Sequence, residues 1–149
     1  MPSIYNISDN QAILNRINQL TPNSEGLWGK MTVDQMLKHC IAPLDITLGN
    51  TQPSKPNFIM GLLGKMLKNK IINGTEYKKN SPTAPDFVFT ETYNFEQTKQ
   101  ELLEKVAEFQ KGTQVVKLDK HPFFGKMSTE DWDKLQWKHL NHHLQQFGV

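Results

Sequence analysis

Residues 128–149, STEDWDKLQWKHLNHHLQQFGV, are the stretch that decides the fold of this chain. Ser128 or Thr129 can cap the start of a helix, because a hydroxyl oxygen accepts hydrogen bonds from its first free backbone amides. Three acidic residues follow in the first turns, where the helix dipole favours negative charge. Gly148 stands where such a helix would end. The stretch therefore predicts one long helix at the C-terminal end of the sequence.

One face of this helix is marked by residues that recur at a 4-3-4-3 spacing: Trp132, Gln136, His139, His143 and Gln146. That spacing is typical of the seam that a helix turns toward its bundle partners. His139 and His143 are four residues apart, so their Cβ atoms lie roughly 5–6 Å from each other on one face. Two imidazoles placed in this way can bind one metal ion. The alternative is a structural role, since imidazoles also favour the negative end of a helix dipole.

A third histidine lies in a second predicted helix, which Thr32 and Gln35 open with a capping-box pattern. His39 stands one position from the apolar stripe of that helix. If the two helices face each other in the interior, His39 can meet His139 and His143. Three neutral imidazoles leave one coordination position open, which is the pattern of catalytic rather than structural zinc. The sequence therefore predicts a three-histidine metal site.

Four further residues could belong to the site or lie next to it. His142 is turned about 100° from its neighbour on the helix, which places it at the edge of the seam. Cys40 is turned by a similar angle from His39, so a core role fits it better than ligation. His121 could lie over the mouth of the site as a proton carrier at neutral pH, with simple packing as the alternative. Gln146 could orient a metal ligand, or be an exposed amide.

The rest of the chain completes an all-α pattern. Apolar residues at helical spacing, together with caps and terminal glycines, predict further helices over about 9–20, 32–49, 58–72 and 94–112. A long loop covers 73–93. Alternating residues over 87–92 indicate a short strand, which residues 115–118 could pair with.

Residues 58–72, FIMGLLGKMLKNKII, allow three interpretations. A core helix with solvated lysines is the one that we favour. A helix lying on a membrane surface is an alternative, because basic residues adjoin apolar ones. An apolar face here could also join two copies of the chain as a homodimer.

The bulk composition sets limits on the class of protein. The chain has 149 residues, which fits a single domain over 1–149. Its net charge of +2 is too close to balance to indicate nucleic-acid binding. No apolar run approaches the ~20 residues of a membrane span. With no signal peptide and one cysteine, we expect a cytoplasmic protein without internal disulfides.

Several blocks of this sequence resemble the DinB-like superfamily of four-helix bundles: WGKMTVDQMLKH (28–39), SPTAP (81–85), HPFFGKMSTEDW (121–132) and HLNHHLQQ (139–146). The resemblance covers most of the chain and is closest to an uncharacterised branch. It implies an up-down-down-up four-helix bundle. It also implies a divalent metal, usually zinc or nickel, held by His39, His139 and His143.

The resemblance also bears on function. Characterised members include transferases that join low-molecular-weight thiols to electrophiles, and a thiol-dependent isomerase, while many members have no known activity. We therefore expect a metal-dependent enzyme, thiol transferase-like or hydrolase-like, that acts on a small molecule. A non-catalytic metal- or ligand-binding bundle is the alternative. A metalloprotease is excluded, because its motif needs Glu where Leu140 follows His139.

Overall fold

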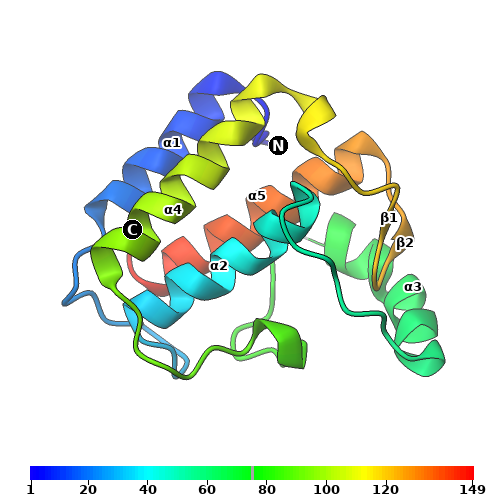
Figure 1. Ribbon diagram of the computed structural model, residues 1–149, viewed down its shortest axis with the longest axis horizontal. Helices are drawn as coiled ribbons and strands as arrows, with labels where there is room; N and C mark the ends of the chain where they lie inside the picture. Colours follow the sequence, from blue (N-terminus) through cyan, green and yellow to red (C-terminus); the bar gives the residue numbers. More distant parts are fainter. Residues whose placement is uncertain (75) are drawn as a thin grey trace.

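Four helices of the computed structural model, which describes residues 1–74 and 76–149, form a closed bundle (Figure 1). They are α1 (Ile7–Gln19), α2 (Val33–Thr47), α4 (Phe95–Glu108) and α5 (Thr129–Gln146). Helix α4 packs on both α1 and α2, and α5 closes the ring by packing on the same two helices. In Figure 1, α1 and α5 run one way along the bundle while α2 and α4 run the other way. The up-down-down-up bundle is therefore confirmed.

Local sequence signals explain where these helices begin. Gln35 Oε1 accepts a hydrogen bond from the Thr32 amide at 3.0 Å, as expected for a capping box at the start of α2. Ser128 and Asp131 make the reciprocal pair of bonds at the start of α5. Asn94 caps α4. Helix α1 starts earlier than predicted, because Asn6 provides its cap.

The core lies inside this ring. Apolar side chains of all four helices meet there with almost no exposed surface, among them Ile13, Ile17, Met36, Leu37, Leu44, Leu102, Val106 and Leu140. A smaller cluster of Ile72, Met127 and Trp132 lies where α5 begins. These contacts hold α2 and α5 against each other, and α2 and α5 carry the three predicted metal ligands.

The predicted strand over 87–92 and its partner over 115–118 are wrong. Short 3-10 turns at Pro85–Phe87 and Thr113–Val115 reach into these segments, and a third, Phe109–Lys111, follows α4. The segments bond to α2 rather than to each other: Glu91 O accepts from Gln35, and the Lys117 amide donates to Thr47 O. The short two-stranded piece exists elsewhere, where β1 (Lys120–His121) pairs antiparallel with β2 (Gly125–Lys126).

Helix α3 (Phe58–Asn73) stands beside the bundle and contacts α5 and β2 (Figure 1). The interpretation of this segment as a core helix is wrong. Its only buried residues are Gly64 and Ile72, while most of its large apolar side chains are exposed. None of the helices in the described residues is long and apolar enough to cross a lipid bilayer.

Candidate metal centre

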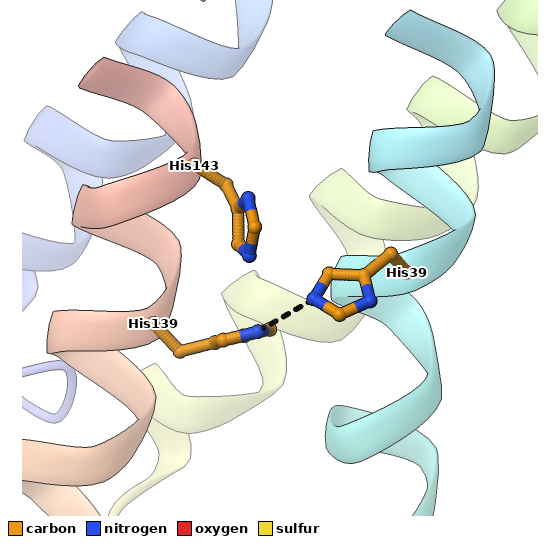
Figure 2. Close-up of side chains that lie close together, drawn as sticks. All are labelled: His39, His139 and His143. Atoms are coloured by element: carbon orange, nitrogen blue, oxygen red, sulfur yellow. Dashed lines mark hydrogen bonds between the residues drawn. The ribbon is translucent and has the colours of Figure 1, made fainter. Parts of the chain in front are cut away.

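Three imidazole rings from α2 and α5 converge on one point (Figure 2). One nitrogen from each of His39, His139 and His143 lies within 4.8 Å of the other two. The Nε2 atoms of His39 and His139 are 3.0 Å apart. His139 and His143 stand one turn apart on α5, and His39 faces them from α2. The predicted convergence of the three rings is confirmed.

The orientation of His39 is set by a backbone carbonyl. Its Nδ1 lies 2.8 Å from the carbonyl oxygen of Phe87. A carbonyl oxygen can only accept, so Nδ1 carries the proton and Nε2 keeps its lone pair. The lone pair of His39 Nε2 therefore points at the other two rings. Nothing in the sequence could have identified this contact, because any residue provides a backbone carbonyl.

His143 is oriented by a side-chain amide. Its Nδ1 lies 2.8 Å from Gln146 Oε1, while Gln146 Nε2 donates to the carbonyl oxygen of Trp28 at 2.8 Å. The second bond decides which end of the amide faces His143, so the ring again holds its proton on Nδ1. Gln146 is buried rather than exposed. The loop comes this close because Gly29 has no side chain: a Cβ there would lie 2.5 Å from Gln146 Nε2.

His139 differs from the other two rings. Its Nδ1 is buried and has no hydrogen-bond partner among the described residues. Since His39 Nε2 carries no proton, the short contact between the two Nε2 atoms requires His139 to donate. One proton thus lies between two ring nitrogens that are both suited to ligation.

Burial keeps all three rings neutral. Desolvation lowers the pKa of His143 to about 3, with a further contribution from the nearby His39. Desolvation also lowers the pKa of His139 well below its usual value, and the nearby His143 and His39 lower it further. Desolvation lowers the pKa of His39 as well, although its hydrogen bond to the Phe87 carbonyl opposes this shift. At neutral pH the rings are therefore in the form that binds metals.

Comparison with known proteins gives a family but no activity. A family model described as a protein of unknown function (DUF1569) matches residues 3–148. The chain belongs to the DUF1569 family. No curated protein and no solved structure gives a significant match. The likeness to DinB-like bundles stays a prediction, and the function of this DUF1569 protein has to be argued from its site.

The two residues that neighbour the ligands do not join them. Cys40 is buried in the core with its Sγ 3.7 Å from Met36 Sδ, and burial raises the pKa of its thiol. The ring of His142 lies at the edge of the site, 5.7 Å from that of Trp28 and 5.8 Å from that of Tyr77. In this DUF1569 protein, three of the four histidines on α2 and α5 form the cluster, and His142 lies beside it.

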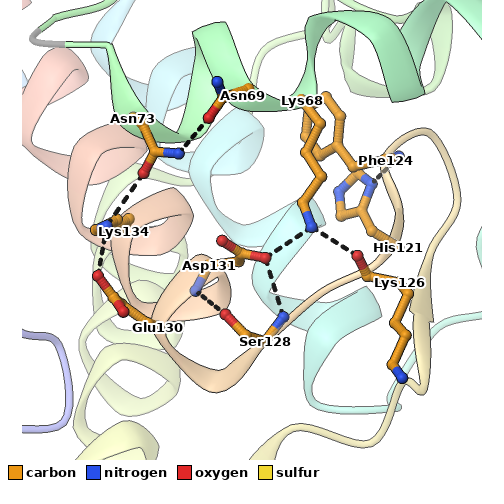
Figure 3. A network of polar contacts seen from close by, with 10 residues as sticks. All are labelled: Lys68, Asn69, Asn73, His121, Phe124, Lys126, Ser128, Glu130, Asp131 and Lys134. Atoms are coloured by element: carbon orange, nitrogen blue, oxygen red, sulfur yellow. Dashed lines mark hydrogen bonds and ion pairs between the residues drawn. The ribbon is translucent and has the colours of Figure 1, made fainter.

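His121 lies in the β1–β2 hairpin (Figure 3) and is not one of the three clustered rings. Its ring stacks on Phe124 with centroids 4.4 Å apart, and its Nδ1 accepts from the backbone amides of Phe123 and Phe124. Burial lowers the pKa of His121 to about 4, so the ring is neutral at pH 7. It lines a small cavity together with Phe87 and Gln136. A proton-carrier role stays a prediction, and packing is its observed role.

Proposed function

We propose that this DUF1569 protein is a metal-dependent enzyme in which His39, His139 and His143 hold one divalent ion. One observation carries the proposal. Two of the three rings have their protons held on Nδ1 by Phe87 O and Gln146 Oε1, so their Nε2 lone pairs face a common point beside the third ring. Lone pairs that face each other at short range repel unless a cation or proton lies between them.

The donor set suits zinc or nickel. Three imidazole nitrogens favour transition metals over magnesium or calcium, which prefer oxygen ligands. Within the described part of the chain, no carboxylate and no thiol joins the three rings. Buried, neutral rings need little proton displacement to bind an ion near neutral pH.

When bound, such an ion would act as a Lewis acid that favours the anionic form of a water or thiol at its open position. Hydrolase-like chemistry would use the water, and thiol transferase-like chemistry would use a low-molecular-weight thiol with an electrophilic small molecule. The role of this chain's residues is to hold and orient. His39 and His143 are kept in the ligating tautomer by Phe87 O and Gln146 Oε1.

The alternative is a bundle that binds a metal or ligand without turnover. The small size of the cavities near the site favours it. The cavity beside Phe87 and His121 measures about 30 Å³ and the one beside Trp28 and His142 about 80 Å³, and none of the three ligands lines either of them. An enzyme would need one of these regions to open for a larger substrate.

The metal content of purified protein tests the site. We expect close to one zinc or nickel ion per chain by elemental analysis, and its loss in His139→Ala and in His143→Ala. His142→Ala is the matched control, because it removes a histidine of the same helix that lies outside the cluster. Metal content that is unchanged in both ligand variants would overturn the proposed site.

Turnover is tested separately. Metal-loaded protein is assayed with low-molecular-weight thiols and a model electrophile, and with simple esters for hydrolysis. We expect a rate that disappears on chelation and in His139→Ala but persists in His142→Ala. Stoichiometric metal without any metal-dependent rate would support the non-catalytic alternative instead.

A further inference from the structure

Helix α3 presents its apolar side chains outward, away from the rest of the molecule. The exposed fractions are 86% for Phe58, 75% for Ile59, 53% for Leu62 and 73% for Met66. Met60, Leu63 and Leu67 add to the same surface. Monomeric proteins rarely expose a continuous apolar surface of this extent, and such surfaces mark sites of interaction. We call these seven residues the outer face of α3.

The inner side of α3 buries one large apolar residue, Ile72, and is otherwise held to the domain by polar contacts (Figure 3). Lys68 Nζ pairs with Asp131 at 2.7 Å and donates to the carbonyl oxygen of Lys126 at 2.7 Å. Lys134 Nζ donates to Asn73 Oδ1 at 3.1 Å. These contacts tie α3 to the start of α5 and to the β1–β2 hairpin. Rotating the helix to bury its apolar side would break them.

A glycine provides a second reason why α3 cannot rotate. A Cβ at Gly64 would overlap the backbone carbonyl of Phe123, so the hairpin packs directly on the helix backbone at this position. At the other end of the helix, Lys138 Nζ donates to the carbonyl oxygens of Ile71 and Gly74. The outward direction of the apolar side chains is thus built into the fold.

The charge around α3 indicates which partner would cover the outer face. Residues 46–75 contain no Asp or Glu but four lysines, of which Lys68 is paired and Lys55, Lys65 and Lys70 are exposed. An antiparallel pairing of two copies about the centre of the outer face, between Leu62 and Leu63, would bring Lys55 of each copy toward Lys70 of the other, which is repulsive. An anionic surface complements this pattern, since apolar side chains flanked by lysines are typical of helices that lie in a membrane interface.

We propose that the outer face of α3 docks on the surface of an anionic lipid bilayer. The stretch from Phe58 to Leu67 is about 15 Å long, so it would lie in the headgroup region rather than span the membrane. The lysines near it would meet the lipid headgroups. Because α3 lies outside the bundle, this docking is independent of the metal site and of any metal bound there.

Vesicle flotation of the full chain tests the proposal. We expect binding to phosphatidylcholine vesicles that contain phosphatidylserine, and much less binding to vesicles of phosphatidylcholine alone. Replacing Ile59, Leu62 and Met66 together by Ser should lower binding at least about tenfold, because the inserted apolar area is removed. These three side chains are exposed, so the variant is expected to fold, and far-UV circular dichroism checks that it does.

Two control variants separate the two parts of the interaction. Changing Ile7, Leu27 and Val88 together to Ser removes three other exposed apolar side chains and should leave binding unchanged. Changing Lys65 and Lys70 to Glu should remove the preference for anionic vesicles while the apolar face stays intact.

Three outcomes would overturn the proposal. The first is no binding to either kind of vesicle. The second is equal binding to neutral and anionic vesicles. The third is a chain that light scattering shows to be a dimer and that becomes monomeric in the Ile59, Leu62 and Met66 variant, which would mean that a second copy covers the outer face.

Discussion

Helix α5 turns its apolar side chains toward the core, whereas helix α3 turns most of its apolar side chains toward solvent. Helix α5 lies between α1 and α2, and its Leu140 is almost fully buried. Helix α3 meets the domain through polar contacts and the single apolar residue Ile72, and it turns Leu62 and its apolar neighbours outward. A periodic pattern tells which residues share a face of a helix. It does not tell whether that face meets the core, because this depends on what stands opposite.

The same substitution in the two helices gives the largest expected contrast. Leu140→Ala should lower the free energy of unfolding by about 2–5 kcal/mol, because it leaves a cavity in a packed core. Leu62→Ala should change it by less than about 0.5 kcal/mol, because its side chain is exposed. Urea denaturation measures both. Equal losses would show that something covers α3 in solution.

Acidification should act through the histidines, none of which lies in α3, and His121 of the β1–β2 hairpin is one of them. Folding lowers the pKa of His121 from 6.5 to about 4, so the unfolded chain takes up a proton where the folded chain does not. The stability from this neutral ring is fully present above pH 6.5 and is lost as the pH falls toward 4. The loss from His121 alone should reach roughly 3 kcal/mol.

The variant His121→Asn isolates this contribution. Asn keeps an acceptor for the amides of Phe123 and Phe124 but does not titrate. We expect a lower stability at pH 7, from the lost stacking on Phe124, and a smaller loss of stability between pH 6.5 and 4. Denaturation of metal-free protein over that range measures the slope, and an unchanged slope in the variant would contradict the assignment.

Gln146→Ala tests the orienting contact on α5. Removing the amide that holds His143 in its ligating tautomer should weaken zinc or nickel binding about 10–100-fold, measured by competition with a chelator. Gln145→Ala is the control, because Gln145 is exposed and has no such bond. Equal affinities in the two variants would mean that Gln146 only fills space.

Two glycines of α3 give the smallest and most specific contrast. Gly64→Ala should cost about 1 kcal/mol or more, because its Cβ would push the Phe123 carbonyl and the hairpin away. Gly61→Ala meets nothing closer than Pro56 Cγ at 4.0 Å, and should stabilise the helix by about 0.5–1 kcal/mol. Thermal unfolding compares them. A stabilising Gly64→Ala would show that the hairpin does not rest on α3.

The three ligands could be predicted because helical geometry carries the information. Residues four apart on a helix share a face, as His139 and His143 do, and the capping box at Thr32 placed His39 on a second helix. That this helix faces α5 was an assumption, which the structure confirms. The contacts that orient these rings could not be predicted in the same way. The Phe87 and Trp28 carbonyls belong to the backbone of distant segments, and only the folded chain brings them to the site.

The strand predicted over 87–92 failed for a related reason. Alternation over six residues is compatible with a strand, but its backbone still needs partners. Those partners are side chains at the start of α2: Asp34 accepts from the Tyr93 amide, and Gln35 donates to Glu91 O. With these bonds made, no second strand is required.

The sequence by itself determined most of the helices, the caps of α2, α4 and α5, and the shared face of His139 and His143, because each depends on spacing within one helix or on short-range hydrogen bonds. Only the tertiary structure decided that His39 meets the other two rings, the tautomers of His39 and His143, and the outward direction of α3. Those depend on contacts between segments far apart in the chain, among them Gln146 with Trp28 and Lys68 with Asp131. A residue pattern within one segment carries no record of such partners.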